Sequence, residues 1–340
     1  AITRRLSAVE DLAGDAVGRE ELALCLKEVG DLERLIGRIV YGAAGCRDLV
    51  ALAAGLGRLP RLRELLAPYP SALLASLREE LQSRGCPIPP MTLINESDAV
   101  LLAAGVQNPG QGRYLGVTWG SSIDVGFVAP GSIVLRWPGI PGDLTLFTGG
   151  FSQAQCVPFG LVDYSKDRDC YAPGLDLYLK MVSTDYLGEI FRLVMIKAAE
   201  RKLLSFGCSR DILSLTQLDL ETVLQFMAHP QAGGTLAHFC REPEDREVAL
   251  VVAQAALERA ARLVCANLAA VIQFIGGGRD ANAPVCLSLQ GSAFSAPPLM
   301  AIFEAQVQAY LRDTLGLHVT LWQGDNALPV GTAAAALYRT

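Results

Sequence analysis

The sequence has no hydrophobic run long enough to cross a membrane, although hydrophobic residues make up 51% of its 340 residues. A membrane-spanning helix needs about 20 consecutive, mainly apolar residues. We therefore expect no contact with a membrane, and the apolar residues are available for a sizeable core. The length is enough for two ordinary domains.

Motifs that would pair cysteines or bind metals are also missing. The nine cysteines form no C-x-x-C motif, and an odd number cannot all pair internally. Most of them stand in apolar surroundings, where cysteine behaves as a small hydrophobic residue. The three histidines, at positions 229, 238 and 318, lack metal-ligand spacing. These patterns predict a reduced, cytoplasmic protein with no metal site.

Positive charge is not concentrated anywhere in the chain. Basic and acidic residues balance in residues 1–85, so the net charge of −6 belongs to the remainder. Without a basic patch we expect no direct contact with nucleic acid. The phosphate-binding pattern G-x-x-x-x-G-K-S/T does not occur either, which excludes a nucleotide site of that type.

The first 82 residues carry the periodicity of helices. Leu22, Cys25, Leu26 and Val29 recur at helical spacing, and Pro60 suits the first turn of a further helix. The pattern predicts an all-α segment that buries its leucine stripes against another surface.

Part of this segment resembles the helical core of MutS-type mismatch-repair ATPases. The matching residues are 31–35, DLERL, followed by Gly42 and by Arg47-Asp48-Leu49. The resemblance implies a scaffold that does no chemistry itself. A fusion relic, a junction artefact and an interaction module remain alternatives for the segment.

A proline-rich stretch, CPIPP at residues 86–90, follows and predicts an extended linker. We place the domain boundary between residues 70 and 90 and divide the chain into residues 1–82 and 83–340.

The second domain begins with polar residues after a short apolar run. Thr92–Ile94 predicts a buried strand, followed by Asn95-Glu96-Ser97 and by a helix with Asp98 as its cap. Tyr114–Trp119 and Val125–Val128 predict strands joined by a turn at Gly120-Ser121-Ser122. Polar groups at strand ends are typical of ligand sites in open α/β sheets.

The remaining residues alternate between the two kinds of element. We expect an all-α N-terminal segment followed by an α/β lobe with a mixed sheet. Strands are predicted at 133–137, 144–147, 285–289 and 318–321, and helices at 203–224, with Thr216 as a possible cap, at 246–276 and at 300–315.

Residues 83–340 resemble the large lobe of hexokinases, sugar kinases of the actin-like ATPase (ribonuclease H-like) fold. The resemblance rests on Asn-Glu-Ser at 95–97, Gly-Ser-Ser-Ile-Asp at 120–124 and YLKMVSTDYLGEIFRLVMIKAAER at 178–201. It implies ATP with Mg²⁺ as cofactor and a hexose as substrate.

The resemblance also implies roles for individual residues. Glu96 matches the catalytic base, and Asn95 and Glu189 match substrate-binding residues. Nucleotide-binding positions are matched by Gly120, Ser121, Gly291, Ser292 and Gly331. From the residues alone, Glu189 could be an ordinary acid in the first turn of a helix, and Gly331 could serve close helix packing.

Four departures from the family pattern affect the chemistry. Glu96 replaces an aspartate, Ser122 replaces a glycine, Asp124 adds negative charge near the phosphates, and Phe147 stands where a sugar-binding glutamate is found. The small-lobe motifs do not occur in residues 1–90. We therefore expect a kinase lobe that is impaired or inactive. The alternatives are a non-catalytic protein that binds sugar, nucleotide or a partner, and a MutS fragment joined to a kinase lobe.

Overall fold

A computed structural model describes residues 94–133, 144–151, 154, 157–170 and 173–337, with isolated residues between 21 and 61. The chain divides into two compact units, Ala1–Leu93 and Ile94–Thr340. In the first unit, every described residue with assigned secondary structure is helical. The division predicted after residue 82 stays a prediction, because the residues around it lie outside the described ranges.

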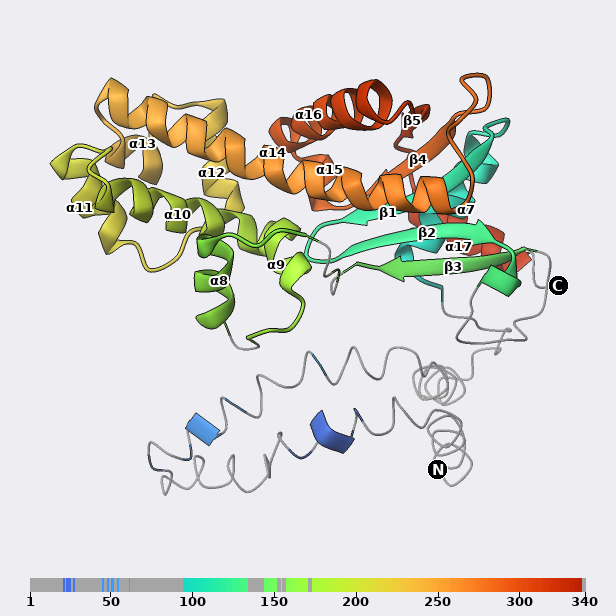
Figure 1. Cartoon of the computed structure of the whole chain (residues 1–340), viewed down its shortest axis with the longest axis horizontal. Helices are drawn as coiled ribbons and strands as arrows, with labels where there is room; N and C mark the ends of the chain where they lie inside the picture. The colour runs from blue at the N-terminus through green and yellow to red at the C-terminus, as the bar shows by residue number, and fades with distance from the viewer. Residues whose placement is uncertain are drawn as a thin grey trace, which may run out of the picture. The chain divides into compact units, whose positions relative to one another are not determined.

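The second unit is built on a five-stranded mixed sheet (Figure 1). Its strands are β1 (Arg113–Trp119), β2 (Ile123–Ala129), β3 (Thr145–Gly150), β4 (Val285–Gln290) and β5 (Val319–Trp322). The spatial order is β3-β2-β1-β4-β5. The β1–β2 and β2–β3 pairs are antiparallel, whereas β1–β4 and β4–β5 are parallel. The prediction of a mixed sheet is confirmed.

The helices keep the numbering of Figure 1, which begins at α7 in this unit. They are α7 (Glu96–Gln107), α8 (Leu161–Arg168), α9 (Leu177–Val182), α10 (Thr184–Glu200), α11 (Phe206–Ser214), α12 (Leu220–Ala228), α13 (Thr235–Phe239), α14 (Pro243–Phe274), α15 (Ser292–Ser295), α16 (Pro297–Gln306) and α17 (Ala327–Leu337), with a 3-10 turn at Gly131–Ile133 and a π-helical turn at Val307–Thr314.

The two faces of the sheet are covered by different helices. Because successive side chains of a strand point to opposite faces, Leu115, Val117 and Trp119 share one face and form the main core with α14 and α16. On the other face, Gly116 and Gly126 lie directly beneath the first turn of α7. Helix α17 packs against α7 on that side.

A second, smaller core lies among α10–α13 and the beginning of α14 (Figure 1). Phe191, Met195, Ile212 and Phe226 are buried in it. Helix α14 runs from this helical group to the sheet, so one long helix contributes to both cores.

Several sequence-based boundaries differ from the structure. The predicted helix 203–224 is two helices, α11 and α12, and Asp219 rather than Thr216 caps α12 by accepting a hydrogen bond from the Thr222 amide at 2.7 Å. The predicted helix 300–315 turns π-helical from Val307. Ile133 belongs to a 3-10 turn, while the rest of that predicted strand, and residues 92–93 of the first one, lie outside the described residues.

Candidate functional site

Three of the predicted nucleotide-binding residues lie together where β1 and β4 end. The amide of Thr184 donates to the carbonyl of Gly120 at 2.9 Å, and the Thr184 and Ser292 hydroxyls are 3.3 Å apart. A Cβ placed on Gly120 would be 3.1 Å from the Ser292 hydroxyl. We call Gly120, Thr184, Gly291 and Ser292 the hairpin cluster. It occupies the carboxyl ends of two parallel strands, the usual ligand-binding edge of such sheets.

Gly291 is required by the local backbone. Its φ of +118° is one that side-chain-bearing residues rarely adopt, and a Cβ there would collide with the carbonyl of Trp119. The Trp119 indole in turn donates to the Val182 carbonyl at 2.8 Å. The ends of β1, β4 and α9 are therefore locked together, while Ser121 is exposed in the neighbouring turn.

The predicted base and its neighbour form the start of α7. Asn95 is the N-cap of this helix, and its side-chain oxygen accepts from both the amide and the hydroxyl of Ser97 at 2.9 Å. Glu96 follows in the first turn and is exposed, so its carboxylate is accessible to a substrate. The expectation that Asp98 caps the helix is wrong, because Asn95 does so.

Asp98 instead points into the sheet. Its side chain is only 8% exposed, and one carboxylate oxygen accepts from the Thr148 hydroxyl at 2.7 Å. Burial raises the pKa of Asp98, the Thr148 hydrogen bond lowers it, and the charge of Asp124 raises it further. Burial also raises the pKa of Asp124.

Glu189 lines a polar pocket of about 760 Å³ bordered by α8, α10 and the segment 215–219. Both of its carboxylate oxygens accept from Arg192, at 2.8 and 2.6 Å, and Arg192 also donates to the Leu215 carbonyl at 2.8 Å. The pair fixes the Glu189 carboxylate in the wall of the pocket. Lone pairs left free by Arg192 can still accept hydrogen bonds from a ligand.

Gly331 lies away from these groups. It is buried in α17, and a Cβ there would collide with the backbone of Ala99 in α7. Close packing of two helices accounts for this glycine. Its predicted contact with nucleotide stays a prediction.

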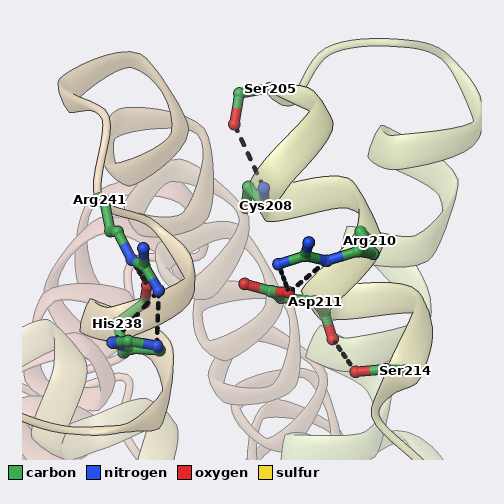
Figure 2. A network of polar contacts seen from close by, with 7 residues as sticks. All are labelled: Ser205, Cys208, Arg210, Asp211, Ser214, His238 and Arg241. Carbon is green, nitrogen blue, oxygen red and sulfur yellow. Dashed lines mark hydrogen bonds and ion pairs between the residues drawn. The ribbon is translucent and has the colours of Figure 1, made fainter.

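The helical group α11–α13 has a polar network of its own (Figure 2). Ser205 caps α11 by accepting from the Cys208 amide at 3.2 Å, Arg210 pairs with Asp211, and Arg241 donates to the His238 carbonyl at 2.7 Å. The Ser205 and His238 contacts lie at the ends of α11 and α13, whereas the Arg210–Asp211 pair joins neighbouring residues within α11. None of them includes a residue predicted for the site.

Sequence reasoning missed Thr184 and Arg192. Both lie within the stretch 178–201 that carries the resemblance, and Arg192 stands three residues after Glu189, the spacing at which side chains meet on a helix. That spacing was the available signal for Arg192. Thr184 gave no signal, because its partners come from distant parts of the chain.

The sequence model of a protein family, Hexokinase_2: Hexokinase, matches residues 148–338, more than half of the chain. The chain belongs to the hexokinase family. The matched range contains Glu189, Gly291, Ser292 and Gly331, whereas Asn95, Glu96, Gly120 and Ser121 precede it.

Two solved hexokinases share the fold of the lobe. The hexokinase of Schistosoma mansoni, solved in complex with glucose, superposes with a TM-score of 0.60 at 20% identity, covering 77% of this chain and 61% of that one. A second crystal structure of hexokinase gives 0.62 at 17% identity, covering 78% and 59%. The chain thus spans about three-fifths of each of these solved hexokinases.

The N-terminal segment is related to a different protein. It is 55% identical over 82 residues to the DNA mismatch repair protein MutS of Myxococcus xanthus and 51% identical over 78 residues to that of Anaeromyxobacter sp. strain Fw109-5. These matches cover 24% and 23% of this chain, but only 9% of each MutS protein. The chain therefore joins a MutS-like segment to a hexokinase-like sugar kinase lobe.

The described residues also bear on the predictions about membranes and metals. No helix in the described part of the chain is long and apolar enough to span a membrane. Over the same residues, no group of three or more histidine, cysteine, aspartate or glutamate side chains is arranged to hold a metal ion.

Proposed function

We propose that the hexokinase lobe binds a hexose and ATP with Mg²⁺, and that phosphoryl transfer is impaired in this chain. The observation that best supports binding is the hairpin cluster, which lies at the start of α10, the helix whose next turn brings Glu189 into the polar pocket. One helix thus connects the predicted nucleotide side with the predicted sugar side.

In this proposal each residue acts through its own chemistry. Glu96 takes the proton of the sugar hydroxyl, and Asn95 and Glu189 position the sugar through hydrogen bonds. Gly120, Ser121, Gly291 and Ser292 hold the nucleotide near the strand ends, and Gly331 allows α17 to pack closely against α7. When bound, ATP supplies the phosphoryl group, and its Mg²⁺ neutralises the negative charge of the phosphates.

The impairment of phosphoryl transfer is inferred from three residues that depart from the family pattern. The Glu96 carboxylate reaches about one bond further than an aspartate, and a misplacement of about 1 Å can cost about a hundredfold in rate. Asp124 adds negative charge next to the hairpin, and Ser122 replaces a glycine in the turn. The same alterations favour a second candidate, a non-catalytic protein that binds sugar, nucleotide or a partner. A mismatch-repair role would rest on a segment that matches only 9% of MutS.

Glucose-dependent production of ADP by the full chain tests this proposal. We expect slow turnover that increases in Glu96→Asp by up to about a hundredfold, because the shorter side chain restores the position of the base. Calorimetric titration with ATP accompanies the assay. Binding of ATP without turnover in either protein would favour the non-catalytic candidate, and absence of both would reject the kinase proposal.

A further inference from the structure

Two carboxylates face the same side of the sheet beside the hairpin cluster. Asp124 lies on β2, and Asp98 reaches the strand from α7 above it. The approach is possible because Gly116 and Gly126, which are paired across β1 and β2, leave room for the first turn of the helix. A Cβ on Gly126 would be 2.7 Å from Oδ1 of Asp98.

One oxygen of this pair lacks a partner. Oδ2 of Asp98 accepts from Thr148, but Oδ1 is buried and makes no hydrogen bond. A buried carboxylate oxygen without a partner is costly, so this position calls for a hydrogen or a cation. Oδ2 of Asp124 accepts from the Ser122 hydroxyl at 3.2 Å, and the Asp124 side chain is only half-buried. Asp124 therefore offers an approach from solvent.

Among the described residues, no positive side chain compensates the pair. Within the described residues, neither carboxylate forms an ion pair with a lysine, arginine or histidine. The charge of Asp124 adds to the effect of burial in raising the pKa of Asp98. The buried Asp98 carboxylate and the half-buried Asp124 carboxylate, with the hydroxyls of Ser122 and Thr148 beside them, form a set of hard oxygen donors.

We propose that Asp98 and Asp124 together bind a hydrated Mg²⁺ ion. Mg²⁺ prefers oxygen ligands, keeps several of its waters and is commonly held by one or two carboxylates, so two carboxylates suffice where a larger cluster is absent. The ion supplies the missing partner for Asp98 and removes the repulsion within the pair. With the ion bound, Asp124 would assist the binding of phosphate groups instead of opposing it. This consequence rests on the proposed function, whereas the metal site itself does not.

The test uses the full chain stripped of metal with EDTA, without sugar or nucleotide. Binding of Mn²⁺, a spectroscopic substitute for Mg²⁺, is followed by electron paramagnetic resonance, and thermal unfolding is followed with and without MgCl₂. We expect one Mn²⁺ per chain, displaced by Mg²⁺, and a higher unfolding temperature with Mg²⁺. Asp98→Asn and Asp124→Asn should each weaken binding by about tenfold or more. Glu304→Gln, an exposed acid on α16, should change nothing.

Failure to bind Mn²⁺ at millimolar concentration would overturn the proposal. So would unchanged binding in Asp98→Asn and Asp124→Asn. If Asp98→Asn does not fold, the half-buried Asp124→Asn still decides the question. If Asp98→Asn raises the unfolding temperature of the metal-free protein and Mg²⁺ does not, the two carboxylates share a proton and no ion is bound. Glucose titration of the same samples keeps the outcomes separate, because loss of sugar binding alone rejects only the proposed function.

Discussion

Two helix glycines in this lobe differ in the space around their Cα atoms. Gly331 faces the backbone of Ala99, whereas Gly105, in α7, is exposed, and a Cβ added there would meet no atom within 4 Å. The first glycine is needed for close approach of two helices. The second only weakens its helix, because glycine is a poor helix former.

The same substitution should therefore have opposite effects at these two glycines. Gly331→Ala should lower the free energy of unfolding by about 1–3 kcal/mol through overpacking, and Gly105→Ala should raise it by about 0.5–1 kcal/mol. Chemical unfolding of both variants measures this. Equal effects would contradict the close contact between α7 and α17.

Two ion pairs on α10 with the same spacing give a second comparison. Glu189–Arg192 is mostly buried, with side chains 16% and 13% exposed, whereas Lys197–Glu200 is about half exposed. Arg192→Met should lower the free energy of unfolding by about 2 kcal/mol, because it leaves the Glu189 carboxylate without its cation. Lys197→Met should change it by less than about 0.5 kcal/mol. Similar losses in the two variants would mean that the Glu189 pair is not held in the pocket wall.

Residue identity predicted the site unevenly. Short motifs singled out Gly120, Gly291 and Ser292, which the fold brings together at the ends of β1 and β4, while their contact with nucleotide stays a prediction. Asp98 was misread as a helix cap, because its burial depends on Gly116 and Gly126, which come later in the chain and meet α7 only in the folded sheet. Long-range pairing of this kind leaves no mark in the sequence around the residue.

At the scale of elements, α14 connects the two cores, and its faces differ sharply. Leu268 is fully buried, while Val251 is 62% exposed. Leu268→Ala should lower the free energy of unfolding by about 2–5 kcal/mol, and Val251→Ala by no more than about 0.5 kcal/mol. Thermal or chemical unfolding provides the measurement. Equal losses would mean that the face of α14 that carries Leu268 is not packed in the core.

The burial of Cys265 in α14 also makes the free energy of unfolding depend on pH in the alkaline range. Burial raises the pKa of the Cys265 thiol from its ordinary value of 9.0 to about 12. The unfolded chain loses this proton near pH 9 while the folded chain keeps it, so the free energy of unfolding falls between pH 9 and 12. The contribution approaches about 1.4 kcal/mol per pH unit. Unfolding of Cys265→Ala at pH 8 and pH 10 should show a smaller decrease than the original chain; an identical decrease would mean that the thiol is accessible.

Long, strongly periodic elements were predicted well from the sequence. Helix 246–276 corresponds to α14 (Pro243–Phe274), and strand 285–289 to β4 (Val285–Gln290). Boundaries set by side-chain caps or irregular turns were not. Apolar spacing continues through residues 215–219, so the separation of α11 from α12 depends on the Asp219 cap, and the π-helical turn after α16 has no distinct sequence pattern.

At the scale of the whole molecule, one chain contains two segments that are related to different proteins. The MutS-like segment lies at the N-terminus, and residues 94–340 form a compact unit of their own. If the units are independent, a protein of residues 83–340 should unfold at the same temperature as the lobe within the full chain. A markedly lower unfolding temperature of the shortened protein would show that the first unit stabilises the lobe.

The central claim is that the lobe retains the sugar-binding wall of a hexokinase. Calorimetric titration of the full chain with glucose tests it most directly, with Glu189→Gln as the variant and Glu304→Gln as the control. We expect weak, saturable binding that is lost in Glu189→Gln and kept in Glu304→Gln. Absence of any binding, or equal binding by all three proteins, would contradict it.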